Sequence, residues 1–332
     1  MKKRNILVVG GAGYIGTHMV KALLRAGYKV ITLDDLSTGH RTLLPGGIFY
    51  EGSLGDGKFL DRIFSEYQIS AVMHFAAFSL VGDSIQNPIA YYRNNIAETI
   101  ELIAAMLRNN VKYFIFSSSA AVYGEPVAIP IKEDHPRNPT NPYGATKVAV
   151  EKLLNDCDCA YGLKSVSLRY FNAAGADESG KIGELHEPET HLIPLVLKVA
   201  SGEKENIKIF GTNYPTYDGT CIRDYIHVND LAQAHLLALK ALLSEKKSSV
   251  YNLGNSKGYS VYKVIELAEQ ITGKTIHTVE VERRPGDPAE LVANSDRIRQ
   301  DLGWKPKYED LETIITTAWN WHTARKPLCE NN

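Results

Sequence analysis

The sequence predicts an α/β fold in which helices cover both faces of a parallel β-sheet, with a smaller lobe toward the C-terminus. Three observations lead to this prediction. The apolar run at residues 5–9 breaks into a glycine-rich turn and a helical stretch. Near-continuous apolar strands then alternate with helical segments as far as Tyr170, which is typical of a buried parallel sheet. After Asn172 the alternation stops, and a length of 332 residues fits two domains or one large unit with a subsidiary lobe.

The first turn carries the pattern Gly10-Gly11-Ala12-Gly13-Tyr14-Ile15-Gly16. It follows a strand and precedes a helical stretch at residues 17–26, which Gly27 closes. Glycines in this setting allow a tight turn and let a pyrophosphate approach the N-terminus of the helix. The pattern therefore predicts a Rossmann-type, doubly wound dinucleotide-binding sheet.

Two carboxylates, Asp34 and Asp35, end the second apolar run, at residues 29–33. They lie about 20 residues after the glycines, where an acidic side chain binds the ribose hydroxyls of NAD. The extra phosphate of NADP would be repelled by the same charge. We therefore expect NAD as the cofactor.

The elements that follow repeat the strand and helix alternation. Within the strand at residues 71–75, His74 is interpreted as a core histidine because its neighbours are apolar. The helix expected at residues 88–109 carries Asn94 and Asn95, and the strand at 113–116 runs into Ser117, Ser118 and Ser119. The remaining predicted elements of this part are a strand at 48–51, a helix at 143–160 and a strand at 165–170.

The second lobe is predicted to be interwoven with the first. Residues 173–225 are rich in Gly, Pro, Glu and Thr around one helical piece at 192–200, whereas 230–243 is a strong helix and 251–253 a short strand that could rejoin the main sheet. We expect a dinucleotide-binding domain at 1–174, joined by 226–255, and a substrate lobe formed by 175–225 and 256–332. A terminal helix is expected at 311–322.

Tyr143 and Lys147 stand four residues apart at the start of a predicted helix, so they share one face. A cation beside a phenol lowers its pKa and makes it a candidate general base. Such a pair arises roughly once by chance in a chain of this composition, and Tyr259 with Lys263 is a second copy. We favour the first pair because it belongs to the predicted sheet, whereas the second lies on an apolar helical stripe.

Composition restricts the other function classes. The formal net charge is −1, with 44% hydrophobic and 23% charged residues, which argues against nucleic acid or an anionic membrane as a partner. The N-terminal apolar run is too short for a signal peptide and no apolar run reaches 18 residues, so we expect a cytoplasmic protein. The cysteines, Cys157, Cys159, Cys221 and Cys329, lack paired spacing and are interpreted as free thiols, with no disulfide and no metal.

Several motifs together resemble the extended short-chain dehydrogenase/reductase superfamily and, within it, the UDP-glucose 4-epimerase family. They are Gly10 to Gly16, Ser119 to Gly124, Tyr143-x-x-x-Lys147, Arg169 to Asn172, Tyr214 to Thr216, Asp218 to Thr220, Cys221 to Val228 and Arg284 to Asp287. The resemblance covers nearly the whole chain. It implies interconversion of UDP-glucose and UDP-galactose by hydride removal and return at carbon 4, through a 4-keto sugar. It also implies a homodimer, formed through the predicted helices at 88–109 and 143–160.

Residue roles follow from the same resemblance. Tyr143 would act as the base, Ser119 would bind the same oxygen, and Lys147 would bind the nicotinamide ribose. Cofactor contacts are implied at Gly10, Gly13, Tyr14, Ile15, Gly16, Asp34, Asp35, Leu36, Ser53, Leu54, Phe75, Ala76, Ala77, Ser79, Asn95, Ser117, Tyr143, Lys147, Tyr170 and Phe171. Substrate contacts are implied at Ser119, Tyr143, Asn172, Leu192, Phe210, Arg223, Arg284, Asp287 and Leu291.

Three positions depart from the family pattern and bear on cofactor retention. Ser53 replaces a frequent acidic residue near the adenine, Ser79 replaces a Lys near the phosphates, and Val9 replaces a Thr before the glycines. For Arg223 and Arg284 an ion pair is the alternative to a pyrophosphate contact.

Other reactions on the same fold are the competing interpretations. A nucleotide-sugar dehydratase needs an acid/base pair after Ser119, where this chain has Ala120 and Ala121. A 4-epimerase acting on UDP-GlcNAc/UDP-GalNAc, UDP-glucuronate or a UDP-pentose stays open, because the chemistry at carbon 4 is the same and Leu291 is intermediate in size. An ordinary reductase would not need the arginine blocks, and a noncatalytic sensor would not need Tyr143 and Lys147.

Overall fold

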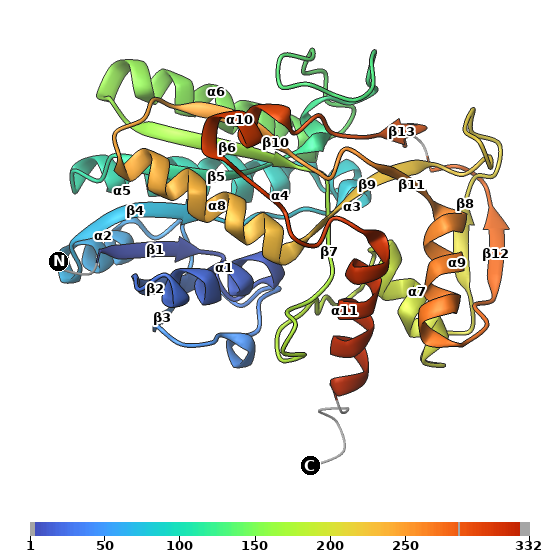
Figure 1. Ribbon diagram of the computed structural model, residues 1–332. Helices are drawn as coiled ribbons and strands as arrows, with labels where there is room; N and C mark the ends of the chain where they lie inside the picture. The colour runs from blue at the N-terminus through green and yellow to red at the C-terminus, as the bar shows by residue number, and fades with distance from the viewer. Residues whose placement is uncertain (1–3, 285, 326–332) are drawn as a thin grey trace.

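The computed structural model describes residues 4–284 and 286–325 and is built on a seven-stranded sheet with the order β10-β6-β5-β4-β1-β2-β3. Every neighbouring pair is parallel. The strands are β1 (Asn5–Val9), β2 (Lys29–Asp34), β3 (Ile48–Glu51), β4 (Ile69–His74), β5 (Tyr113–Ser119), β6 (Lys164–Tyr170) and β10 (Ser249–Leu253). Figure 1 shows helices in front of and behind this sheet, which confirms the predicted Rossmann-type α/β class.

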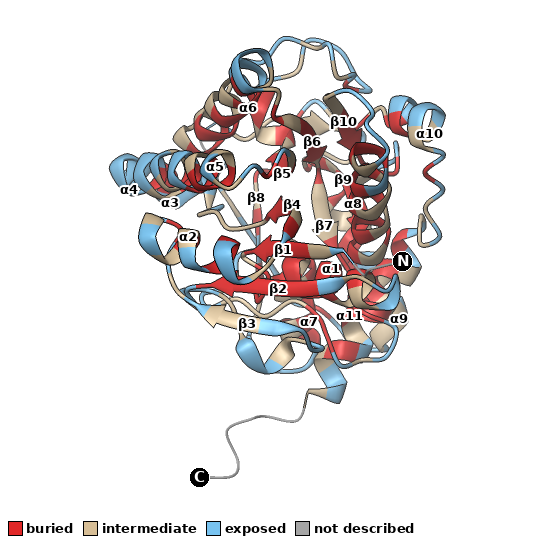
Figure 2. Cartoon of the chain, turned by 90° about the vertical axis from the view of Figure 1, so that its left-hand side faces the viewer, coloured by how far each residue is buried: buried red, intermediate tan, exposed pale blue. Residues whose placement is uncertain are grey.

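Successive strand residues point to opposite sides of the sheet. Because helices pack on both sides, both faces are buried. Ile6 and Val8 of β1 enter one core cluster with α1 (Tyr14–Arg25) and α8 (Val228–Leu243). Leu7 and Val9 enter the other, with α2 (Gly57–Glu66), α5 (Glu98–Arg108) and α6 (Pro142–Tyr161). Figure 2 shows the resulting buried centre between two helical layers.

The helix expected at residues 88–109 is interrupted. It consists of α4 (Pro88–Tyr92), a π-helical turn at Arg93–Ala97 and α5, preceded by the short α3 (Val81–Gln86). Thr99 Oγ1 donates to the Asn95 carbonyl at 2.8 Å, and the Asn95 amide bonds to the backbone of Phe78. These contacts hold Asn95 against the loop after β4. The π-helical turn places Asn95 where it can make them, and it replaces the regular α-helical hydrogen bonds there.

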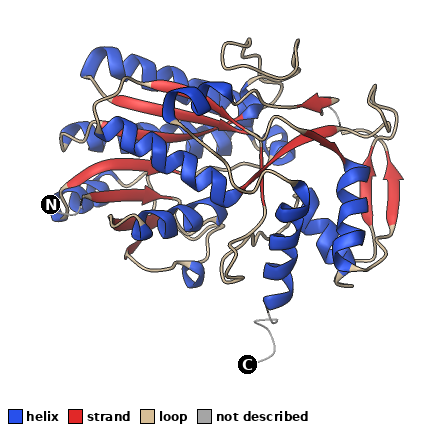
Figure 3. Ribbon diagram, viewed as in Figure 1, coloured by secondary structure: helices blue, strands red, loops and turns tan. Residues whose placement is uncertain are grey.

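The second lobe is built on two smaller sheets. In the first, β9 (Ile222–His227) pairs with β7 (Asn172–Ala174), β11 (Gly258–Ser260) and β13 (Glu290–Leu291). In the second, β8 (Ile207–Phe210) pairs with β12 (Thr278–Val281). The helices α7 (Leu192–Ala200), α9 (Val261–Thr272) and α11 (Leu311–Ala324) share one apolar core beside them (Figure 3).

The chain crosses between the two parts more than once. After β9 it returns through α8 to β10, which pairs with β6 and confirms that residues 251–253 rejoin the main sheet. The small helix α10 (Asp296–Leu302) contacts α8 and β10, and one-turn 3-10 helices lie at Arg41–Leu43 and Ala120–Val122. Among the described residues, no helix combines the length and apolarity needed to cross a bilayer.

Candidate active site

The predicted site residues gather at one edge of the main sheet, because the carboxyl ends of parallel strands lie at the same edge. Gly10 follows β1, Asp34 ends β2, Ser119 ends β5 and Tyr170 ends β6. The other predicted cofactor residues adjoin the same strand ends or the start of α1: Tyr14, Ile15, Asp35, Leu36, Leu54, Phe75, Ala76, Ala77, Ser117 and Phe171. The second lobe begins directly after β6, so it lies beside this edge (Figure 1).

The glycine turn is shaped to hold a ligand against bare backbone. A Cβ at Gly10 would lie 2.3 Å from the Ala76 nitrogen, and one at Gly16 would lie 2.2 Å from the Gly10 oxygen, so neither position tolerates a side chain. A Cβ at Gly13 would approach nothing of the protein closer than 3.4 Å. Gly13 is the N-cap of α1 and offers no side chain to the first helical N–H groups. These donors and the positive end of the helix fit a pyrophosphate.

Asp34 lies at the bottom of this turn and is buried. Its Oδ2 accepts from the Ala12 nitrogen at 2.8 Å and its Oδ1 from the Leu36 nitrogen at 2.9 Å. Burial raises the pKa of Asp34, while the two backbone hydrogen bonds oppose that shift. A carboxylate accepts about four hydrogen bonds, so lone pairs stay available for a ribose diol.

The side-chain amide of Asn95, a predicted cofactor residue, bonds to other groups of the protein. Asn95 accepts from the Phe78 nitrogen at 2.9 Å and from Asn94 at 2.9 Å, and it donates to the Phe78 oxygen and to Thr146 at 3.0 and 3.1 Å. All four hydrogen-bonding positions of its amide are therefore used within the protein. Asn95 thus positions the loop after β4 against α6, and its cofactor contact stays a prediction.

Ser53 and Ser79 are both exposed at the edge of the site. The Ser53 hydroxyl donates to Glu98 at 3.2 Å and accepts from the Gly55 nitrogen at 3.0 Å. An acidic side chain thus stands beside Ser53 although the chain lacks the acidic residue usual at that position. Glu98 comes from α5, 45 residues later, which the sequence alone did not indicate.

Tyr143, Lys147 and Ser119 converge where β5 ends and α6 begins. Asn141 caps α6 by accepting from the Gly144 nitrogen, and the next turns place Tyr143 and Lys147 on the buried face. The Lys147 Nζ lies 5.7 Å from the centroid of the Tyr143 ring and donates to the Ser117 carbonyl at 2.8 Å. Ser119 lies close enough to the Tyr143 hydroxyl to lower its pKa.

The expected direction of the Tyr143 pKa shift is wrong for the chain by itself. Burial raises the pKa of Tyr143, and the hydrogen bond from Ser119 only partly opposes it. Burial also lowers the pKa of Lys147 to about 7, although Glu151 raises it. The spacing correctly brings the two groups together, but desolvation outweighs their mutual charge effect.

A buried polar network behind the site was not predicted. Glu151, one turn after Lys147 on α6, forms a two-pronged ion pair with Arg169 at 2.8 and 2.6 Å and accepts from Ser118 at 2.6 Å. Burial favours the neutral acid, but these hydrogen bonds hold the pKa of Glu151 below its ordinary value. Ser118 and Arg169 adjoin Ser119 and Tyr170, so the network fixes both strand ends against α6. Their adjacency to motif residues was the available signal.

His74 is a core histidine, as interpreted from the sequence. It is 1% exposed, its Nε2 lies 3.1 Å from the Thr99 hydroxyl, and burial lowers its pKa to about 3. It is neutral and packs against the rings of both Phe114 and Phe116, with centroids 5.7 Å away in each case.

The predicted substrate residues lie mainly in the second lobe. Arg223 on β9 forms an ion pair with Asp287, and Leu291 on β13 is its neighbour in the parallel register. The Arg284 guanidinium stacks 3.8 Å from the ring centroid of Phe210, at the end of β8. Asn172 donates to the Asp224 carbonyl at 2.9 Å, and Leu192 begins α7. The ion pair considered as an alternative for Arg223 is thus present, and Arg284 is exposed and stacked.

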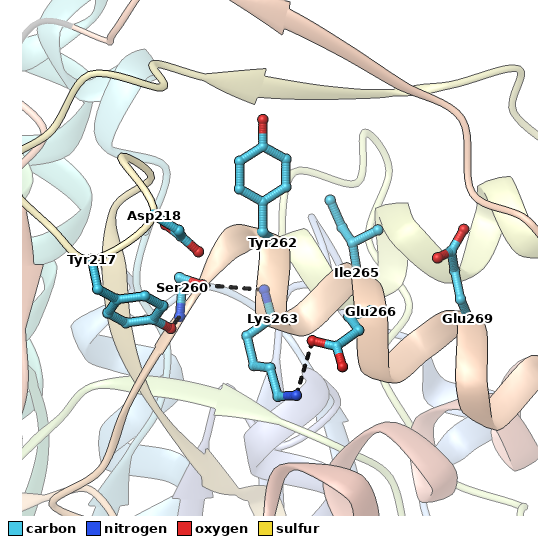
Figure 4. Close-up of a pocket in the computed structure, with 8 residues that line it drawn as sticks. All are labelled: Tyr217, Asp218, Ser260, Tyr262, Lys263, Ile265, Glu266 and Glu269. Carbon is cyan, nitrogen blue, oxygen red and sulfur yellow. Dashed lines mark hydrogen bonds and ion pairs between the residues drawn. The ribbon is translucent and has the colours of Figure 1, made fainter.

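The second Tyr and Lys pair has a different setting. Lys263 forms an ion pair with Glu266 at 2.9 Å, and Ser260 caps α9 through the Lys263 nitrogen. Figure 4 shows both contacts in a pocket beside α9, lined also by Tyr217 and Tyr262. Tyr259 packs against the core of the second lobe. The pair therefore lies on α9 and its preceding strand, outside the edge of the main sheet.

The comparison with known proteins agrees with this geometry. The model of the NAD dependent epimerase/dehydratase family matches residues 6–254, and the chain belongs to that family. Its dependence on NAD confirms the predicted cofactor, and the glycine turn, the uncapped α1 and Asp34 fit that group.

Within the family, relatives that are 45–55% identical to this chain are UDP-glucose 4-epimerases. The one from Halalkalibacterium halodurans is 55% identical over 317 residues, which cover 96% of this chain and 95% of that protein. The one from Lacticaseibacillus casei is 51% identical over 318 residues, covering 96% of each. The crystal structure of UDP-glucose 4-epimerase from Bifidobacterium longum in complex with NAD+ and UDP has a TM-score of 0.93 at 40% identity, covering 97% of this chain and 98% of that one. The resemblance to the UDP-glucose 4-epimerase family is confirmed.

Proposed function

We propose that this protein interconverts UDP-glucose and UDP-galactose, with NAD as its cofactor. The observation that carries the proposal is the convergence of Ser119, Tyr143 and Lys147 at the strand edge that also holds the glycine turn. Ala120 and Ala121 follow Ser119 and supply no acid or base for an elimination. The site is thus equipped to oxidise and reduce one carbinol and to do nothing further to the sugar.

Tyr143 is the base in this proposal. As the phenolate, it would take the proton of the sugar 4-hydroxyl, and Ser119 would hold the same oxygen and relay the proton. Bound NAD would supply the acceptor for the hydride that leaves carbon 4 of the sugar, and a positively charged nicotinamide ring. That charge adds to Lys147 and opposes the effect of burial on the pKa of Tyr143. After the 4-keto sugar has rotated in the site, the same three side chains would serve the return of the hydride to its other face.

Gly10, Gly13 and Gly16 with the N-terminus of α1 would hold the cofactor pyrophosphate, and Asp34 its adenosine ribose. Lys147 would bind the nicotinamide ribose with the donors of its buried amine that Ser117 leaves free. Gly10 lies so close to Ala76 that no side chain fits at this position, so the ligand would meet backbone atoms there.

Recognition of UDP is assigned to the second lobe. Arg223 and Arg284 would bind the pyrophosphate by charge-assisted hydrogen bonds. Arg223 is already oriented by Asp287, and Arg284 is pre-positioned by its stacking on Phe210. Asn172 and Leu192, at the starts of β7 and α7, are also proposed UDP contacts, as are Phe210 and Asp287 themselves. A grip of this kind lets the sugar rotate while the nucleotide stays in place.

Domain division and assembly are part of the same proposal. The cofactor unit is formed by 1–174 with 226–255, and the substrate lobe by 175–225 and 256–332. We place the protein in the cytoplasm. We also propose a homodimer formed through α4, α5 and α6, where Ile89 on α4 and Ile100 on α5 are 75% and 44% exposed (Figure 2). Uncovered apolar faces of this kind mark contact surfaces.

The test is product analysis. Purified protein is given UDP-galactose without added NAD, and the products are separated and identified. UDP-glucose with no net NADH release is the expected result. A 4-keto-6-deoxy sugar would instead establish the dehydratase reaction, and a dependence on added NADH would establish a reductase. Rates on UDP-GlcNAc measured side by side define the substrate range, where Leu291 predicts preference for the unacetylated sugar.

A further inference from the structure

The loop between β7 and α7 gathers two histidines and two glutamates that play no part in the proposed reaction. They are Glu184, His186, Glu189 and His191, and one ligand atom from each lies within 4.8 Å of all the others. The glutamate side chains are only 6% and 3% exposed. Buried carboxylates need a cation or hydrogen-bond donors to balance their desolvation.

The spacing of these atoms matches a tetrahedral metal site. His191 Nδ1 lies 2.7 Å from Glu184 Oε1 and 3.2 Å from Glu189 Oε1, and His186 Nδ1 lies 3.1 Å from Glu184 Oε1 and 3.8 Å from Glu189 Oε2. Four ligands placed about 2.0–2.2 Å from one zinc ion in tetrahedral geometry are about 3.3–3.6 Å apart. These separations, which involve both oxygens of Glu189, lie on either side of this range, and the four ligand atoms lie within 4.8 Å of one another, so a bound ion would draw the side chains together by about 1 Å.

We propose that Glu184, His186, Glu189 and His191 form a structural site for a divalent transition metal of the zinc class. Two imidazole nitrogens and two carboxylate oxygens suit Zn²⁺, whereas Mg²⁺ and Ca²⁺ prefer oxygen ligands alone. All four ligands come from the protein, which is typical of a structural and not a catalytic ion.

The cluster is supported from outside and is accessible to an ion. Glu189 Oε1 accepts from the nitrogens of Thr190 and His191 at 2.7 and 2.8 Å, which fixes the carboxylate in the way that outer hydrogen bonds orient metal ligands. The His191 side chain is 48% exposed, so an ion can enter from that side. The cysteines are not involved, which is why cysteine spacing gave no sign of a metal.

The position of the cluster indicates what the ion would hold together. The Glu184 carbonyl accepts from Trp321 Nε1 at 3.0 Å, and the ring of His186 meets that of Tyr14 edge-on at 6.4 Å. Trp321 belongs to α11, Tyr14 starts α1 at the cofactor turn, and His191 is the N-cap of α7. One ion would thus fix the loop between β7 and α7 where it contacts α1 and α11.

The experiment is a metal titration of the full-length protein, made without a histidine tag and dialysed against a chelator. CoCl₂ is added and the absorption spectrum recorded. We expect about one equivalent of Co²⁺ with the intense visible bands of four-coordinate ligation and no thiolate charge-transfer band. Zn²⁺ should displace it and raise the apparent unfolding midpoint by about 5 °C at a free concentration 100 times the Kd.

Variants locate the site. The double substitution His186→Ala with His191→Ala should weaken Co²⁺ binding by more than the roughly 100-fold that loss of an outer partner alone costs. The matched control is His322→Ala, because in the described part of the chain His322 pairs with one carboxylate, Glu203, at 2.8 Å. It should bind as the parent does. Less than about 0.1 equivalent in the parent protein would show a purely ionic cluster and overturn the proposal. Uptake that survives the double substitution would overturn it as well.

Discussion

Replacing Lys147 by Met should stabilise the fold while removing the activity. Lys147 is 3% exposed, and burial lowers its pKa to about 7 from an ordinary 10.5. This difference corresponds to about 4 to 5 kcal/mol of desolvation, borne by the folded state at pH values below 7. Methionine keeps most of the volume and has no charge to desolvate.

The net gain is smaller than the desolvation term. The substitution removes the hydrogen bond to Ser117, worth about 1 to 1.5 kcal/mol, and the contact 4.9 Å from the Phe116 ring centroid, worth about 1 to 2 kcal/mol. We therefore expect Lys147→Met to raise the unfolding free energy by about 2 kcal/mol near neutral pH. Turnover should fall by at least about 100-fold.

The pH dependence separates this reasoning from ordinary repacking. Between pH 7 and 10.5 the unfolded chain binds more protons than the folded chain, so wild-type stability rises with pH. The advantage of the variant should shrink by about 3 kcal/mol between about pH 6.5 and about pH 9.5.

Urea unfolding of both proteins, freed of nucleotide, measures the difference between them. Lys152→Met, at an exposed position of α6, is the control and should change stability by less than about 0.5 kcal/mol. A Lys147→Met protein that is less stable near neutral pH, or whose difference from wild type ignores pH, would refute the account.

Four further predictions concern the other parts of the molecule. Tyr143→Phe should lower turnover at least about 100-fold while UDP-sugar affinity in calorimetry is retained, and normal turnover would exclude Tyr143 as the base. Asp34→Asn should weaken NAD binding about 10-fold and relieve discrimination against NADP, measured by retention of each dinucleotide. Ile89→Glu should produce monomers in sedimentation velocity, since it places a charge in the proposed dimer contact, and an unchanged dimer would move that contact elsewhere. Burial opposes ionisation of Asp177, but hydrogen bonds led by the one from Lys21 hold its pKa at about 2. The resulting stabilisation is present above pH 3.8 and is lost as pH falls through 2. Lys21→Met should therefore lower the unfolding free energy by about 2 kcal/mol at neutral pH and by little near pH 2, as measured in acid-unfolding curves.

Local signals sufficed where one element determines its own structure. The strand at Ile48–Glu51 and the helix at Leu192–Ala200 match their predicted bounds, and the glycine turn marks the start of α1 to within three residues. The helix α2 was missed although Asp56 caps it and Leu60 and Ile63 lie on its buried face. Its ten residues between two short strands gave too little periodicity to stand out from a loop.

Non-local contacts account for the rest. The π-turn depends on Asn95 reaching Phe78, and the acidic partner of Ser53 comes from α5. The pKa of Lys147 depends on how deeply α6 is packed, which spacing does not reveal. For the site as a whole, the sequence indicated which side chains meet, while the balance of burial and charge between them required the folded structure.

The described cysteines are Cys157, Cys159 and Cys221, and each is a free thiol, as expected from their spacing. Cys329 lies outside the described residues.

The return of the chain to the main sheet has a consequence for synthesis and folding. β10 pairs with β6 from about 80 residues further along, and α8 supplies much of one apolar face of the sheet. A nascent chain that has emerged only as far as β7 therefore has an open strand edge at β6 and an uncovered face over Ile115 and Leu168. The dinucleotide-binding unit cannot close until the ribosome has passed residue 253, so the first half of this enzyme depends on its second half, or on a chaperone, to avoid aggregation.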